Sequence, residues 1–276
     1  MKSRYVLLYD EHCPLCRWYT QLFVRTGLLA PGGRQTLRDW EARDPVLYPN
    51  PHRAMHEIPL LDLQAGEVYY GIDALLALLG QWVPWLPRLG QFPPLHAALR
   101  TLYAFISYNR RILAGGHPCE GACTPDFHAG WRYVWLGFAA LISVLITVAA
   151  GDAAGGAWLG RALAPPESLL ITGSGWLLFL LLTLQLPYRM RMDYLGQLAT
   201  VSFVGVLLLL PALLLDGWLP AAAPWLWAGA IALSFGTMYR MLLRRTRVSL
   251  LPAWYHLSWA LLLLLTAPLS TWLLLY

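Results

Sequence analysis

The chain has 276 residues, of which 58% are hydrophobic and only 13% are charged, and its formal net charge is +5. Because a soluble domain usually carries about 25% charged residues, this composition excludes a protein whose whole surface faces water. The charge is also unevenly distributed, since residues 1–132 hold most of the acids and bases and residues 133–276 are nearly all apolar. The arginines sit between apolar segments without a basic stripe of interleaved aromatics, so we expect no nucleic-acid partner.

The chain opens with a short apolar run, Tyr5–Tyr9, that ends at an acid, Asp10. This run is too short for the core of a signal peptide, and no small-residue cleavage site follows it. A short apolar run bounded by turn residues is typical of a buried β-strand. We therefore predict a strand here and a head that stays in the cytoplasm.

Two cysteines follow this strand where a helix is predicted to begin. Apolar residues recur with helical spacing from Leu15 to Phe23, so Cys13 falls at the helix N-terminus, and Pro14 is tolerated in the first turn. Free backbone N–H groups and the helix dipole stabilise a thiolate there, which lowers the thiol pKa below its free value of about 8.5. We predict that Cys13 is the attacking thiolate and Cys16 the resolving thiol.

Other interpretations of this pair stay open. The two cysteines could simply pack in a degenerate head, or they could form half of a zinc site. His12, if protonated, would lower the Cys13 pKa further, and otherwise it is a solvated turn residue.

The linker before the first long apolar segment holds a second group of cysteines and histidines. Its members are His117, Cys119, Cys123 and His128. A second dithiol that exchanges with the first, a metal site of the Cys2His2 type, and a plain interfacial loop are the three interpretations. The proline-broken apolar stretch over residues 82–105 is interpreted as a face that packs on the chain's own helices or on the bilayer interface, with a partner groove as the alternative.

Several short segments of the head form one pattern, namely Tyr9-Asp10, Cys13-Pro14-Leu15-Cys16, Ile58-Pro59, Gly71-Ile72-Asp73-Ala74-Leu75 and Tyr108-Asn109-Arg110-Arg111. By this pattern the head resembles the DCC family of thiol-disulfide oxidoreductases over about residues 4–115. Where the family usually has glycine after the aspartate, this chain has Glu11, whose carboxylate would raise the Cys13 pKa.

The resemblance implies a thioredoxin-like fold in which a cis Pro59 faces the cysteine pair. Together with Ile58, Pro14 and His12, it would contact an extended substrate. The implied partners are protein thiols or disulfides, and this chemistry requires no organic cofactor.

The second half of the chain predicts a transmembrane bundle of about five spans. Five apolar stretches approach the roughly 20 residues that cross a bilayer; they lie near Trp131–Ala150, Leu169–Pro187, Leu195–Leu215, Ala222–Tyr239 and Trp254–Tyr276. Arginines concentrate in the second and fourth connections, as Arg189, Arg191, Arg240, Arg244, Arg245 and Arg247, against Arg161 alone on the other side. Because the richer side is normally cytoplasmic, we expect the N-terminal head inside and the C-terminus outside the cytoplasmic membrane.

The sequence thus predicts an α/β thioredoxin-like domain over 1–115, a Cys/His linker over 116–130 and an all-α membrane domain over 131–276. The predicted function is a membrane-anchored thiol-disulfide oxidoreductase in contact with lipid. The alternatives are a thioredoxin-like docking module that recruits a membrane-protein partner, and a metal-binding membrane protein that uses the Cys/His linker.

Overall fold

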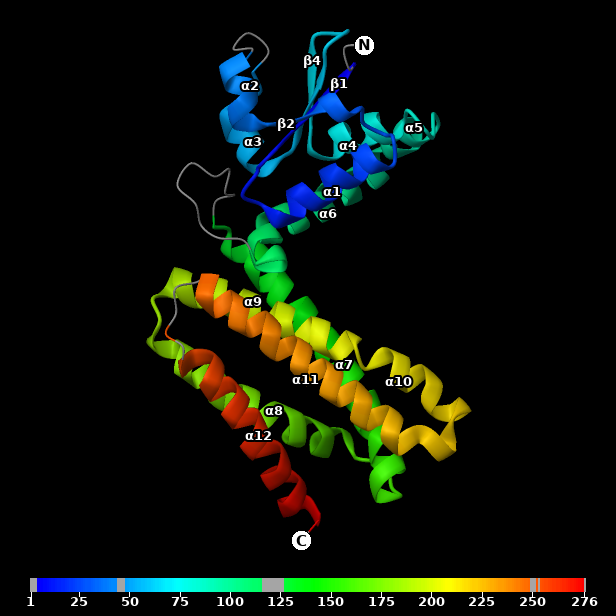
Figure 1. Cartoon of the computed structure of the whole chain (residues 1–276), viewed down its shortest axis with the longest axis vertical. Helices are drawn as coiled ribbons and strands as arrows, with labels where there is room; N and C mark the ends of the chain where they lie inside the picture. The colour runs from blue at the N-terminus through cyan, green and yellow to red at the C-terminus, as the bar shows by residue number, and fades with distance from the viewer. Residues whose placement is uncertain (1–3, 44–47, 116–126, 249–251, 253, 276) are drawn as a thin grey trace. The chain divides into compact units, whose positions relative to one another are not determined.

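The computed structural model describes residues 4–43, 48–115, 127–248, 252 and 254–275. The chain divides into two compact units, Met1–Trp131 and Arg132–Tyr276. Figure 1 shows a mixed α/β domain in the first unit and helices in the second, as the sequence predicts. Most of the predicted 116–130 linker lies outside the described residues, so its status as a separate segment stays a prediction.

The first unit is built on a four-stranded mixed sheet. Its strands are β1 (Tyr5–Tyr9), β2 (Arg34–Thr36), β3 (Pro59–Asp62) and β4 (Glu67–Tyr70), in the order β2-β1-β3-β4. β1 pairs parallel with β2 and antiparallel with β3, and β3 pairs antiparallel with β4. Since helices cover both faces of the central strand, the interior of β1 is apolar and buried, without polar alternation.

Alternate residues of β1 and β3 supply two separate cores, because successive side chains of a strand point to opposite faces. Leu7 and Leu60 belong to one core, which also contains Leu78 of α4 (Gly71–Leu79) and is contacted by residues of α1 (Pro14–Arg25) and α6 (Pro93–Ala114). The opposite core contains Val6, Leu8 and Leu61 from the strands; α2 (Leu37–Arg43) and α3 (Pro51–His56) contribute to it. The short α5 (Leu86–Gly90) lies between α4 and α6 in the chain.

The second unit consists of helices. They are α7 (Ala129–Leu159, which begins in the last residues of the first unit), α8 (Pro165–Leu182), α9 (Tyr188–Leu207), α10 (Leu210–Leu215), α11 (Ala223–Val248) and α12 (Trp254–Leu275). Four helical segments in the described part of the chain are long and apolar enough to cross a membrane; they are Ala129–Leu159, Pro165–Gln185, Tyr188–Trp218 and Pro220–Thr246. These four candidates correspond to four of the about five predicted spans. The fifth predicted span coincides with α12, which is helical but is not among the four.

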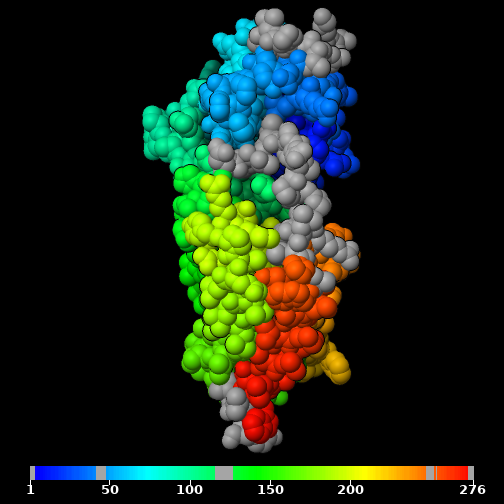
Figure 2. All heavy atoms as spheres, turned by 90° about the vertical axis from the view of Figure 1, so that its left-hand side faces the viewer, coloured from blue at the N-terminus to red at the C-terminus, as the bar shows by residue number. Residues whose placement is uncertain are grey.

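α12 packs antiparallel along α8, as Figure 2 shows for the orange-to-red helix beside the yellow-green one. Gln185 donates a hydrogen bond to the Tyr255 hydroxyl at one end of the contact, and the hydroxyls of Ser174 and Ser270 lie 3.3 Å apart toward the other. Between them Gly175 permits close approach, because a Cβ there would come within 3.2 Å of the Leu263 Cα. The two helices therefore contact each other along the second half of α8, from Ser174 onward.

Candidate functional site

Cys13 is the N-cap residue of α1. Its backbone is extended, with φ −90° and ψ 109°, and its sulfur accepts a hydrogen bond from the Cys16 backbone N–H at 3.3 Å. Pro14 occupies the first helical position, where a missing N–H costs nothing. Both cysteines are free thiols and both are buried. The structure confirms the prediction that the pair lies at a helix start that follows a strand.

Asp10 shapes the turn that carries Cys13 into the helix. Its carbonyl accepts a hydrogen bond from the Cys13 N–H, and its carboxylate accepts one from the His12 N–H at 2.9 Å. The next two side chains, Glu11 and His12, are exposed and lie 3.5 Å apart. At the position where the family usually has glycine, this chain therefore has a solvated carboxylate whose near neighbour is the His12 ring.

A buried arginine from α6 completes the surroundings of the pair. The Arg110 Nη2 atom lies 3.8 Å from the Asp10 carboxylate and donates to the Met55 carbonyl at 3.2 Å. The positive charge of Arg110 helps to lower the pKa of Cys13, and at Cys16 it opposes stronger effects that raise the pKa of that thiol. From the sequence, no place beside the cysteines was predicted for Arg110. The signal that could have revealed it is its place in the Tyr108–Arg111 segment of the family pattern.

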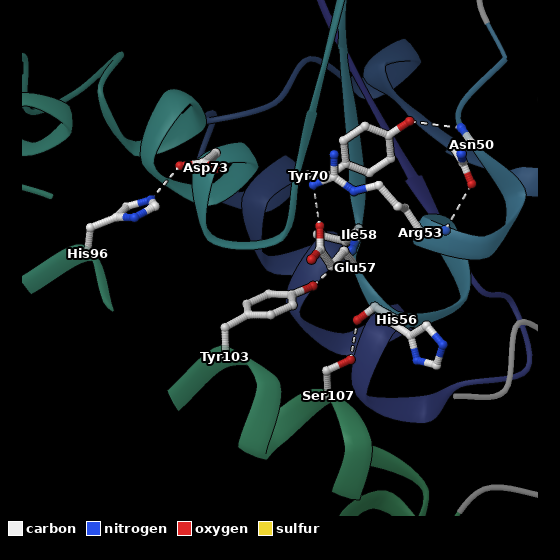
Figure 3. Close-up of polar contacts among 10 residues, drawn as sticks. All are labelled: Asn50, Arg53, His56, Glu57, Ile58, Tyr70, Asp73, His96, Tyr103 and Ser107. Atoms are coloured by element: carbon white, nitrogen blue, oxygen red, sulfur yellow. Dashed lines mark hydrogen bonds and ion pairs between the residues drawn. The ribbon is translucent and has the colours of Figure 1, made fainter. Parts of the chain in front are cut away.

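One face of α6 holds the chain that leads into β3. Tyr103, Ser107 and Arg110 follow one another at i, i+4 and i+7, so they share a face. The Tyr103 hydroxyl accepts a hydrogen bond from the Ile58 N–H at 2.8 Å, and the Ser107 hydroxyl donates to the His56 carbonyl (Figure 3). With the Arg110 bond to Met55, these three contacts are called the α6 clamp.

The prediction of a cis Pro59 is wrong, because the described residues contain no cis peptide bond. Pro59 is buried and pairs with Tyr70 at the start of β3. The Ile58 N–H is bonded to Tyr103, and the Ile58 carbonyl accepts a hydrogen bond from the Gly71 N–H at 3.0 Å. In this extended trans path both backbone polar groups of Ile58 are used within the domain.

The two thiols are electrostatically unequal. The pKa of Cys13 is lowered to about 7, first by a hydrogen bond from the Cys16 thiol and then by the Cys16 backbone N–H and the Arg110 charge, against burial and the nearby Asp10 carboxylate. The pKa of Cys16 is raised, because its proton is shared with Cys13 and because the thiol is buried. Burial also raises the pKa of the neighbouring Tyr103 to about 12. The geometry thus favours a Cys13 thiolate and a protonated Cys16.

Most of the second Cys/His group cannot be placed. His117, Cys119 and Cys123 lie outside the described residues, so the second dithiol and the metal site stay predictions. His128 is described; its ring lies 5.2 Å from that of Tyr108, and its Nδ1 accepts a hydrogen bond from the Trp131 N–H at 3.3 Å. Among the described residues, no three His, Cys, Asp or Glu side chains cluster in a way that could hold a metal ion.

An α/β domain that presents a Cys-x-x-Cys pair at the start of its first helix belongs to the thioredoxin-like class of dithiol domains. The comparison with protein families is more specific: residues 7–115 match the family model of the DCC1-like thiol-disulfide oxidoreductases, so this part of the chain belongs to that family. No curated protein and no solved structure gives a significant match.

Proposed function

We propose that this chain is a membrane-anchored thiol-disulfide oxidoreductase whose working pair is Cys13 and Cys16. The observation that carries the proposal is the Cys13 sulfur at the start of α1, which accepts a hydrogen bond from Cys16 and lies in the field of the buried Arg110. Membership of residues 7–115 in the family supports protein thiols or disulfides as the substrates.

In the reducing direction, the Cys13 thiolate attacks one sulfur of a substrate disulfide. The substrate S–S bond breaks, a mixed disulfide forms with Cys13, and the other substrate sulfur leaves as a thiolate that takes up a proton. Cys16 then loses its proton and attacks the Cys13 sulfur, which closes the Cys13–Cys16 disulfide and releases the second substrate thiol. Two electrons pass to the substrate, and an external dithiol must return them before the next cycle.

Among the residues predicted to contact substrate, Pro14 and His12 are exposed beside Cys13 and remain in the proposal. A backbone contact through Ile58 would require the bond from Ile58 to Tyr103 or the bond from Gly71 to Ile58 to open. The contribution of Ile58 and Pro59 therefore stays a prediction.

The test is to trap the mixed disulfide with a Cys16→Ser variant. Without the resolving thiol, we expect Cys13 to accumulate disulfide-linked proteins that dithiothreitol releases, and we expect none with Cys13→Ser or with the double variant. Equal capture by Cys16→Ser and Cys13→Ser would contradict the proposal. Partners that copurify after removal of all four cysteines would support the docking alternative.

The same trap examines the proposed relay to the second pair. If Cys119 or Cys123 exchanges with the first pair, mass spectrometry of the Cys16→Ser variant should find a peptide in which Cys13 is joined to one of them. A Cys119→Ser/Cys123→Ser variant that turns over at the wild-type rate with a reducible protein substrate would exclude an obligatory relay.

A further inference from the structure

The first unit carries an exposed apolar surface that the cysteine chemistry does not use. It runs from the end of α4 through α5 into α6, and it is called the α5–α6 surface. Its most exposed apolar side chains are Trp82, Trp85, Leu89, Phe92, Leu102 and Ile106. Trp82 is 55% exposed and Trp85 60%, which is unusual for the largest apolar side chain in proteins. α4, α5 and α6 contact one another, and exposed apolar side chains that gather on neighbouring elements mark interaction sites.

The apolar residues continue as a stripe along α6. Leu95, Leu99, Leu102 and Ile106 follow one another at i, i+4, i+7 and i+11, which places them on one side of the helix. Leu95 and Leu99 are half-buried and the other two are exposed. The side of α6 that carries the α6 clamp is turned into the domain, and the apolar stripe beside it is exposed at Leu102 and Ile106.

The charged side chains in this part of the chain are basic. No Asp or Glu occurs between Ala74 and Cys119, and Arg88 and Arg100 are exposed within that stretch. Two acids from neighbouring elements are already paired, Asp73 with His96 at 2.9 Å and Glu57 with Arg53 at 2.8 Å. Exposed tryptophans together with arginines and without acids match an anionic bilayer interface.

The candidate spans of the same chain tether the first unit to a bilayer. Residues 115–128 connect α6 to α7, and α7 is the first of the four candidate spans. Short tethering keeps the α5–α6 surface at a high effective concentration at the membrane surface, so weak lipid contacts suffice to hold it there. We propose that the α5–α6 surface lies on the bilayer interface, with Trp82 and Trp85 among the lipid headgroups and Arg88 and Arg100 near anionic phosphates.

The proposal is tested by hydroxyl-radical footprinting of the full chain in nanodiscs that hold one copy each. One set contains phosphatidylcholine alone, and the other contains equal parts of phosphatidylcholine and phosphatidylglycerol. Trp18 of α1 is the matched control, because it is 66% exposed in the same unit and lies outside the α5–α6 surface. We expect oxidation of Trp82 and Trp85, relative to Trp18, to fall by about threefold or more in the anionic discs.

A double variant, Arg88→Gln/Arg100→Gln, should abolish the difference between the two lipids while the oxidation of Trp18 stays the same. If Trp82 and Trp85 are oxidised as fast as Trp18 in the anionic discs, the proposal is overturned. Protection of equal size in both lipids would overturn it as well, because the surface would then be covered by the chain's own helices. The readout does not involve Cys13, so it is independent of the thiol chemistry.

Discussion

The chemistry proposed for Cys13 depends on how a buried thiolate is stabilised. Removing a charge from water is costly unless hydrogen bonds and opposite charges replace the water. Cys13 receives donors from the Cys16 thiol and backbone, and Arg110 supplies the opposite charge. Arg110 is itself buried, and its own cost is offset by the Asp10 carboxylate and the Met55 carbonyl. The charges of Cys13, Arg110 and Asp10 therefore stabilise one another.

We predict that alkylation of Cys13 by iodoacetamide follows a thiolate with a pKa of about 7. At pH 6 the rate should be about tenfold below its plateau, since one pH unit below the pKa leaves about a tenth of the groups ionised. An Arg110→Gln variant removes a charge that lowers the pKa, so its midpoint should move up toward the free value of about 8.5. At pH 7 its rate should fall about two- to fivefold.

Tandem mass spectrometry assigns the modified cysteine in this measurement. Arg111→Gln is the matched control, because Arg111 is the adjacent arginine and is not part of the α6 clamp. A midpoint that stays at pH 7 in Arg110→Gln, or that shifts equally in both variants, would show that Arg110 does not tune Cys13.

At the scale of elements, contacts between helices decide how the second unit is packed. The α8–α12 contact is the most extensive helix pair in the described part of that unit. A side chain at Gly175 would meet the Leu263 side chain at 2.8 Å and its Cα at 3.2 Å, whereas a Cβ at Gly173 would meet nothing within 4 Å. Small residues at one helix face allow two backbones to approach closely in a membrane.

Gly175→Leu should therefore separate α8 from α12, and Gly173→Leu should leave the pair intact. Overpacking of this kind costs about 1–3 kcal/mol, so we expect a clear drop in the thermal unfolding temperature of the detergent-solubilised protein for Gly175→Leu alone. Scanning fluorimetry with size-exclusion chromatography measures both variants. Equal melting temperatures would show that the close approach contributes nothing to stability.

At the scale of the whole molecule, the distribution of arginines predicts the orientation in the membrane. Arg189 and Arg191 lie at the start of α9, where the positive-inside rule places them in the cytoplasm. On the opposite connection, Arg161 forms an ion pair with Glu167 at 2.9 Å. Because α12 runs antiparallel to the second half of α8, we expect α12 to cross the bilayer together with the four candidate spans, which makes five crossings.

We predict that the N-terminal unit is cytoplasmic and that Tyr276 lies outside. A membrane-impermeant thiol reagent should leave Cys13 unlabelled in intact cells and label it once the membrane is opened. A reporter fused after Tyr276 should respond as an outside position, and one inserted at the exposed Gly160 provides the matched outside control. An inside signal at Tyr276 would show that α12 does not cross.

Much of the architecture was predictable because its causes are local. The change from a strand run at Tyr5–Tyr9 to helical spacing after Cys13 predicts the place of the dithiol, and the long apolar stretches predict the membrane helices. Each of these patterns is formed by residues that are neighbours along the chain. The family resemblance implied a cis bond at Pro59, and the described residues contain no cis peptide bond.

The sequence by itself therefore determined the class of fold, the two-part organisation and the cysteine pair at a helix start. Only the tertiary structure decided that Arg110 lies beside the cysteines, that Tyr103 of α6 and Gly71 of α4 bind the two backbone polar groups of Ile58, and that Gly175 lets α8 and α12 approach closely. These contacts join residues far apart in the chain. Their formation depends on how the elements are arranged in space, and periodicity and propensity carry no information about that arrangement.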